Sequence, residues 1–104
     1  MEITPNPTTP DVRSGKLKAL ELPDAFKERL LALHAMAPDT GSNVPSYVEN
    51  SENRQIEGYL EGLNETWASG YLALHPDAHE EEILRVVEEA KALFNELEDM
   101  INAA

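Results

Sequence analysis

The 104-residue chain has no cysteine, which excludes disulfide bridges and thiolate metal sites. It also has no apolar run near the roughly 18 residues that would span a bilayer. Its first ten residues, MEITPNPTTP, lack the basic and then apolar layout of a signal peptide. We therefore expect a cytoplasmic protein that does not interact with membranes.

Basic residues are also scarce: eight lysines and arginines face 20 aspartates and glutamates, for a net charge of −12. Residues 1–38 hold five acids and five bases, whereas residues 39–104 hold fifteen acids against Arg54, Arg85 and Lys91. The whole net charge therefore lies in the second segment. Because such a chain repels phosphates, we expect no direct binding to nucleic acid or to anionic membranes.

Signatures of catalysis are missing as well. No base stands at a suitable spacing from Ser42, Ser46, Ser51 or Ser69, and no glycine-rich phosphate loop occurs. The Asp-Ser-Leu attachment site of acyl carrier proteins, which are also small, acidic and helical, is absent. We predict a protein that is not an enzyme, with no catalytic residue and no cofactor.

The amino-terminal residues have little to bury. Pro5, Pro7 and Pro10 disfavour regular structure, so we predict a flexible Pro-rich arm over residues 1–20 and a single helical domain over residues 21–104. The domain begins with a helix from Pro23 to Ala37. Its apolar residues recur at steps of three and four, at Phe26, Leu30, Leu33 and Ala37.

Two longer helices follow the turn residues 38–45. The second starts at Ser46, which forms a capping box with Glu49, or else near Ser51, and its apolar stripe is Ile56, Leu60, Leu63, Trp67, Tyr71 and Leu74. The stripe of the third is Ile83, Val87, Ala90, Phe94, Leu97 and Ile101, widened by Val86, Leu93 and Met100. A short connection between such helices favours an antiparallel hairpin. The predicted fold is therefore all-α: a three-helix bundle with a long antiparallel helical hairpin, formed by helices two and three, and a flexible N-terminal arm.

The connection itself, HPDAHEEE at residues 75–82, has two interpretations. His75 and His79 are four residues apart, as metal ligands on one helix face would be, but Pro76 confines His75 to the helix start or to the preceding turn. We predict no metal site. Helix initiation explains the residues better, with Asp77 as cap, Glu80 three positions later and His79 packed toward the apolar side.

The stretch YLALHPD, residues 71–77, resembles the end of the second helix and the loop motif of J-domain co-chaperones. The residues that follow keep roughly the apolar spacing of that family's third helix, and the likeness covers about thirty residues. It implies that His75, Pro76 and Asp77 would stimulate an Hsp70 chaperone. The family's second helix is basic, however, whereas Glu57, Glu61 and Glu65 make this one acidic.

The second and third helices are rich in acidic residues: no lysine or arginine stands four residues after Glu57, Glu61 or Glu65, and only Arg85 and Lys91 offset the acids of helix three. Gly58 and Gly62 lie beside the acidic residues of helix two and opposite its apolar stripe, where they allow a partner to approach the backbone or, alternatively, mark a kink. The aromatic residues Tyr59, Trp67 and Tyr71 are expected in the core. The predicted partner-binding residues are Glu57, Gly58, Glu61, Gly62, Glu65, Glu81, Glu82, Glu88, Glu89 and Glu96.

These features predict a small protein-binding module, an inhibitor or regulator of the antitoxin, immunity or phage anti-defence type. Its acidic helical face would dock on a basic, possibly nucleic-acid-binding, groove of a target protein. A self-associating structural or assembly subunit, such as a homodimer, is the first alternative, because the apolar stripe of helix three is wide. A divergent J-domain-like co-chaperone is the second.

Overall fold

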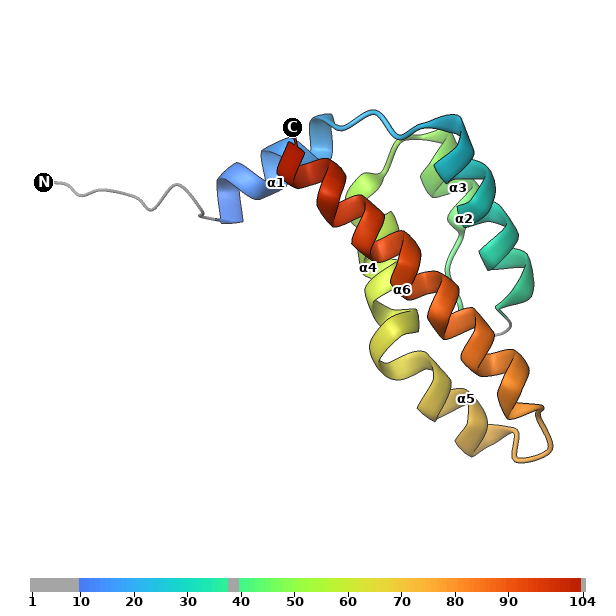
Figure 1. Ribbon diagram of the computed structural model, residues 1–104. Helices are drawn as coiled ribbons and strands as arrows, with labels where there is room; N and C mark the ends of the chain where they lie inside the picture. The colour runs from blue at the N-terminus through green and yellow to red at the C-terminus, as the bar shows by residue number, and fades with distance from the viewer. Residues whose placement is uncertain (1–9, 38–39, 104) are drawn as a thin grey trace, which may run out of the picture.

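The computed structural model describes residues 10–37 and 40–103 (Figure 1). These residues are helical with no strand, so the all-α class is confirmed. The elements in chain order are α1 (Pro10–Ala19), α2 (Asp24–Met36), α3 (Val44–Glu49), α4 (Asn53–Gly62), the π-helical segment η1 (Leu63–Trp67), α5 (Ala68–Leu74) and α6 (Glu80–Ala103). The chain is thus divided more finely than into three helices. Within the described ranges, no helix combines the length and the apolarity that a membrane crossing would need.

The helix predicted over residues 23–37 is confirmed as α2, which starts after Pro23 and ends before Ala37. The fixed φ of proline suits a helix start. The apolar residues at steps of three and four, Phe26, Leu30 and Leu33, are buried, and α2 contacts both α6 and α3.

Part of the predicted amino-terminal arm is helical. Residues 1–9 lie outside the described residues, but residues 10–19 form α1, and Leu17 lies in the core. Asn53 attaches this helix to the domain: its side-chain amide, 3 % exposed, donates to the backbone oxygens of Leu17 at 2.9 Å and Leu20 at 2.7 Å. The last carbonyls of a helix have no partner within the helix, so one buried side chain both caps α1 and fixes its position.

The second predicted helix is interrupted near its start. The capping box at Ser46 is wrong, because Asn43 caps α3 and accepts a hydrogen bond from the Ser46 N–H at 3.3 Å. The short α3 ends at Glu49, and Ser51 takes a positive φ of 55° before α4 begins at Asn53. A left-handed residue cannot continue an α-helix, so α3 and α4 are separate elements.

The chain continues as one helical path from α4 through η1 into α5. Ile56, Leu60 and Leu63 are buried as predicted, but Leu74, at the end of the predicted stripe, is 79 % exposed. A π-turn holds an extra residue compared with an α-turn, so it rotates every later side chain around the helix axis. The turn at Leu63–Trp67 therefore breaks the register that the sequence pattern assumed.

The last helix begins at Glu80, three residues after the predicted cap. The backbone oxygen of His79 accepts from Glu82 at 3.0 Å and from Ile83 at 3.3 Å, while Asp77 lies exposed in the preceding turn. The prediction that Asp77 caps this helix is wrong, as is the prediction that His79 packs toward the apolar side, since His79 is exposed. The buried face of α6 also differs slightly from the predicted stripe: Val86 and Leu93 are buried, whereas Val87 and Phe94 are only half-buried.

The core is concentrated away from the turn that joins α5 and α6. Helix α6 lies along α4, η1 and α5 and ends beside α1, so α5 and the start of α6 form the lower end of the molecule in Figure 1. Among the described elements, α5 contacts η1 and α6, and it contributes no buried residue. We call residues 63–88 the distal end and the other described residues the packed end.

Candidate protein-binding surface

The acidic residues predicted on the second helix follow one another along α4 and into η1. Glu61 and Glu65 are exposed and Glu57 is half-buried. Residues four apart share a helix face, so Glu57 and Glu61 form a ridge along α4 that Glu65 extends into η1. Between residues 57 and 89 the chain carries nine acidic residues and a single basic one, Arg85, so the potential beside this ridge is strongly negative.

Three of the acidic residues predicted on the third helix, Glu81, Glu82 and Glu88, are exposed on α6. Glu81 and Glu82 stand in the first turn of the helix, where the backbone dipole favours negative charge. Part of the acidity of α6 therefore stabilises its own start and needs no partner to explain it.

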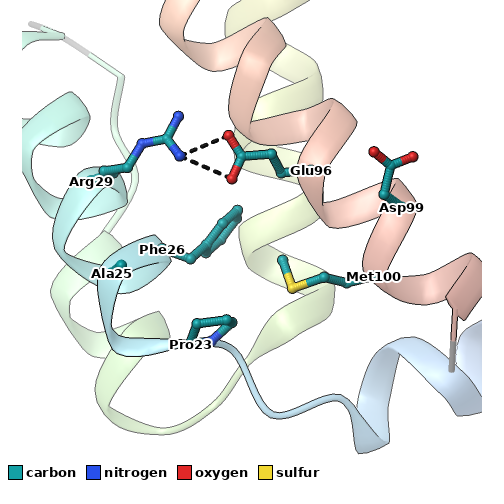
Figure 2. Close-up of a pocket in the computed structure, with 7 residues that line it drawn as sticks. All are labelled: Pro23, Ala25, Phe26, Arg29, Glu96, Asp99 and Met100. Carbon is teal, nitrogen blue, oxygen red and sulfur yellow. Dashed lines mark hydrogen bonds and ion pairs between the residues drawn. The ribbon is translucent and has the colours of Figure 1, made fainter.

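Glu89 and Glu96, the other two acidic residues predicted on α6, are half-buried and pair with a base of α2. The Arg29 Nη1 atom lies 2.9 Å and 2.7 Å from the two carboxylate oxygens of Glu96 (Figure 2). The Arg29 Nε atom lies 3.7 Å from Glu89 Oε2. Hydrogen bonding to Glu96 raises the pKa of the Arg29 guanidinium. One base from α2 thus offsets two acids of α6, a pairing between residues so far apart in the chain that helical spacing gives no sign of it.

A hollow of about 420 Å³ adjoins this ion pair. Phe26 and Met100 extend toward each other below Arg29 and Glu96, and Pro23 and Asp99 complete the lining (Figure 2). Because Arg29 and Glu96 already bond to each other, the surface that the hollow offers to a ligand is mostly apolar.

Gly58 and Gly62 line a second hollow, of about 260 Å³, together with Thr40, Ser42, Tyr59, Leu63, Thr66 and Trp67. A Cβ atom added at either glycine would meet nothing within 4 Å. The fold therefore does not need glycine at these positions, although glycine weakens a helix interior by about 1 kcal/mol relative to alanine. The helical path runs through both residues, and the π-turn follows directly after Gly62.

Three aromatic rings continue the same side of the molecule along α5. The rings of Trp67 and Tyr71 stack at 5.5 Å and 29°, and those of Tyr71 and His75 lie 4.3 Å apart at 32°. Beside them a third hollow, of about 240 Å³, is lined by Thr66, Trp67, Gly70, Tyr71, Leu74 and His75. It shares Thr66 and Trp67 with the glycine hollow, and we call these two neighbouring hollows together the α4–α5 groove.

The aromatic residues expected in the core behave differently from one another. Tyr59 is buried and Trp67 packs against the core cluster, whereas Tyr71 is half-buried and lies outside that cluster. Tyr59 meets His34 edge to face at 6.1 Å, and neither its hydroxyl nor His34 Nδ1 has a hydrogen-bond partner. Burial raises the pKa of Tyr59 to about 12.

Comparison with known proteins gives no family model, no curated protein and no solved structure that matches this chain. In the described part of the chain, no group of three or more histidine, aspartate or glutamate side chains is placed to hold a metal ion. The J-domain resemblance rests on residues 71–77 and the apolar spacing after them. Its HPD residues form the turn between α5 and α6, with His75 against Tyr71.

Proposed function

We propose that this protein is a binding module that docks its acidic helical surface on a basic surface of another protein. The observation that carries the proposal is the acidic ridge of α4 and η1, where Glu61 and Glu65 are exposed in a region that holds one basic residue among nine acidic ones. Like charges four residues apart cost a helix about 0.2 to 0.5 kcal/mol per pair. A basic partner removes this repulsion and makes the arrangement favourable.

The chemistry of the surface favours a target that itself binds anions. Regularly spaced carboxylates along a helix present a row of negative charges, which is the feature that a nucleic-acid-binding groove recognises in a phosphate backbone. Charge complementarity of this kind speeds association and makes it sensitive to salt. The proposed role is therefore that of an inhibitor or regulator which competes for a basic groove.

The proposal includes the finer architecture expected from the sequence. In it α4, η1 and α5 act as one long arm, α6 pairs with this arm as the second half of an antiparallel hairpin, and α2 is the third helix of the bundle. The contacts of α6 with α4, η1, α5 and α2 support this arrangement. A hairpin that is rigid along its length would hold the carboxylates at fixed spacing for the partner.

Affinity capture from lysate tests the proposal, with washes at about 50 mM and about 500 mM salt, because added salt screens exposed charges. The test variant is Glu61→Gln with Glu65→Gln, which removes two charges from the ridge. The matched control is Glu21→Gln with Glu28→Gln, which removes two exposed charges from the segment where acids and bases balance. We expect a defined partner that the wild type and the control retain at low salt and that the ridge variant loses. Equal retention by both variants would contradict the proposal.

Exposed leucines favour a second candidate function, self-association. Leu74 and Leu84 are exposed at the distal end, and two copies would cover them by pairing there. Sedimentation of the wild type and of Leu74→Gln with Leu84→Gln separates this candidate from the first. A dimer that the leucine variant dissociates would support it, whereas a wild-type monomer at micromolar concentration would remove it.

A further inference from the structure

The α4–α5 groove combines glycine with stacked aromatic rings, and exposed carboxylates follow the same helical path. We propose that it holds a single arginine-bearing helix of the partner protein, lying lengthwise along α4 and α5. This inference rests on the proposed function and specifies the element of the partner that binds.

The first argument comes from the two glycines that line the groove. Gly58 and Gly62 are one helical turn apart and leave the α4 backbone bare, and the neighbouring side chains do not fill the space that a Cβ would occupy. Side chains normally keep two helix axes about 8 to 10 Å apart. Glycine at two successive turns allows closer contact over a length that suits a helix lying along α4.

The second argument concerns the charge of the occupant. Glu61 and Glu65 are exposed and are neighbours in sequence of the groove residues Gly62 and Thr66, so their charges lie close to the groove although neither lines it. Trp67 and Tyr71 continue the groove with stacked rings. A guanidinium group pairs with carboxylates and also stacks on aromatic faces, whereas a lysine ammonium is a compact, strongly hydrated charge. The combination therefore fits arginine better than lysine.

The third argument is an unpaired polar group. Tyr59 lines the groove and is only 6 % exposed, yet its hydroxyl has no hydrogen-bond partner. Most buried hydroxyl groups in proteins have one, so an orphan in the wall of a hollow indicates a missing donor or acceptor. The oxygen itself is enclosed, so a polar side chain of a bound helix would supply the partner as the Tyr59 ring turns its hydroxyl into the groove.

A defined probe tests the inference directly. The probe is a fluorescently labelled, alanine-based helical peptide with arginines at every fourth position, and binding is followed by anisotropy at about 50 mM salt. Two further peptides serve as controls: one carries lysine in place of arginine, and the other carries interspersed prolines that prevent the helix without changing the charge. Because Trp67 is the only tryptophan, its own emission reports whether the peptide reaches the groove.

The test variant is Gly58→Gln with Gly62→Gln, and the matched control is Gly15→Gln on α1, where an added Cβ also meets nothing within 4 Å. Circular dichroism melts establish that each variant folds. We expect the arginine helix to bind the wild type and Gly15→Gln equally, with altered Trp67 emission, and to bind the double variant about tenfold more weakly or worse, a loss of about 1.4 kcal/mol. The lysine and proline peptides should bind several-fold more weakly than the arginine helix.

Three outcomes would overturn the inference, and each has a different consequence for the proposed function. If all peptides bind alike and the glycine variant binds as the wild type does, while Glu61→Gln with Glu65→Gln weakens binding, the acidic ridge works without the groove and the proposed function survives. If no peptide binds the wild type, both the inference and the proposed function are contradicted. If the wild type forms a dimer that Gly58→Gln with Gly62→Gln dissociates, the groove belongs to a second copy of the chain.

Discussion

The packed end and the distal end of the molecule are built from the same kind of element but are stabilised differently. At the packed end, α1, α2 and α4 pack against α6, α3 packs against α2 and α4, and most buried residues lie there. The distal end has two helical layers, α5 contributes no buried side chain, and Leu74 is exposed. Under the proposed function the difference separates stability from recognition, because a region that contributes little to the core is free to carry surface chemistry that weakens folding.

Charge follows the same division. At the packed end Arg29 bridges to Glu96 and Glu89, so the bases of the amino-terminal segment offset acids of the carboxy-terminal one. At the distal end Arg85 is the only base among Glu65, Asp77, Glu80, Glu81, Glu82 and Glu88. Glu81 and Glu82 stabilise the start of α6 through the helix dipole, whereas repulsion between Glu61 and Glu65 lowers the stability of the free protein and would be relieved by a basic partner.

The two ends should differ most in how much the free energy of unfolding falls when a leucine is shortened to alanine. Leu93 is fully buried, and Leu93→Ala should lower the free energy of unfolding by about 2 to 5 kcal/mol, since it removes buried methyl groups and leaves a cavity. Leu74→Ala should change it by no more than about 0.5 kcal/mol, because Leu74 is exposed. Urea unfolding measures both. Similar losses would show that the distal end is as tightly packed as the rest.

The next expected effect is a loss of stability at high pH, caused by Tyr59 in the packed end. Burial raises the pKa of Tyr59 from 10.0 to about 12, so the folded protein holds the phenol proton more tightly than the unfolded chain does. The resulting stabilisation is complete below pH 10 and is lost as the pH rises from about 10 through 12. Two pKa units correspond to about 2.7 kcal/mol.

Urea unfolding between pH 9 and pH 12 measures this loss. Tyr59→Phe removes the titrating group, so its stability should fall less steeply than that of the wild type over the same range. Identical profiles would mean that Tyr59 ionises as readily in the folded protein as in the unfolded chain.

A smaller effect tests how α1 is attached. Asn53→Ala removes the amide that bonds to Leu17 and Leu20, leaving their carbonyls without this donor, so we expect a loss of about 1 to 3 kcal/mol. Asn50→Ala is the matched control, because that amide bonds at an exposed site to Ser46 and should contribute little. Hydrogen exchange should show α1 opening before α2 in Asn53→Ala. Unchanged protection of α1 would indicate that Leu17 holds the helix by itself.

The smallest effect concerns the two glycines of the groove, where substitution should raise stability instead of lowering it. Gly58→Ala and Gly62→Ala should each raise the free energy of unfolding by up to about 1 kcal/mol, because alanine favours a helix and the added Cβ meets nothing within 4 Å. Thermal unfolding measures the change. A loss of stability would show that the fold requires these glycines, and would remove the argument that a partner does.

Sequence reasoning predicted the features that depend on a regular period. The repeats of Phe26, Leu30 and Leu33 and of Ile83, Ala90 and Leu97 predicted α2 and α6, because buried faces of uninterrupted helices follow a fixed angle per residue. The exposure of Glu61 and Glu65 followed from the same angle.

Three features were missed because they depend on contacts or on local departures from regular geometry. The π-turn after Gly62 changes the register, so Leu74 was wrongly placed in the stripe. The roles of Asn53 and Arg29 depend on contacts between residues far apart in the chain, and neither residue interrupts a local pattern. The stacked rings have a partial signal in the sequence, the four-residue steps from Trp67 to Tyr71 to His75, but the first two fit the core stripe and His75 fits the turn, so the spacing does not reveal the stack.

The central claim is that the distal end and the adjoining acidic ridge form the docking surface. A titration of the isotopically labelled protein with the arginine helix, followed residue by residue through amide chemical shifts, tests it most directly. The account predicts perturbations confined to residues 57–75 and the first turns of α6, and lost at high salt. Perturbations centred on Pro23, Arg29 and Met100, or spread evenly over all the carboxylates of the chain, would contradict it.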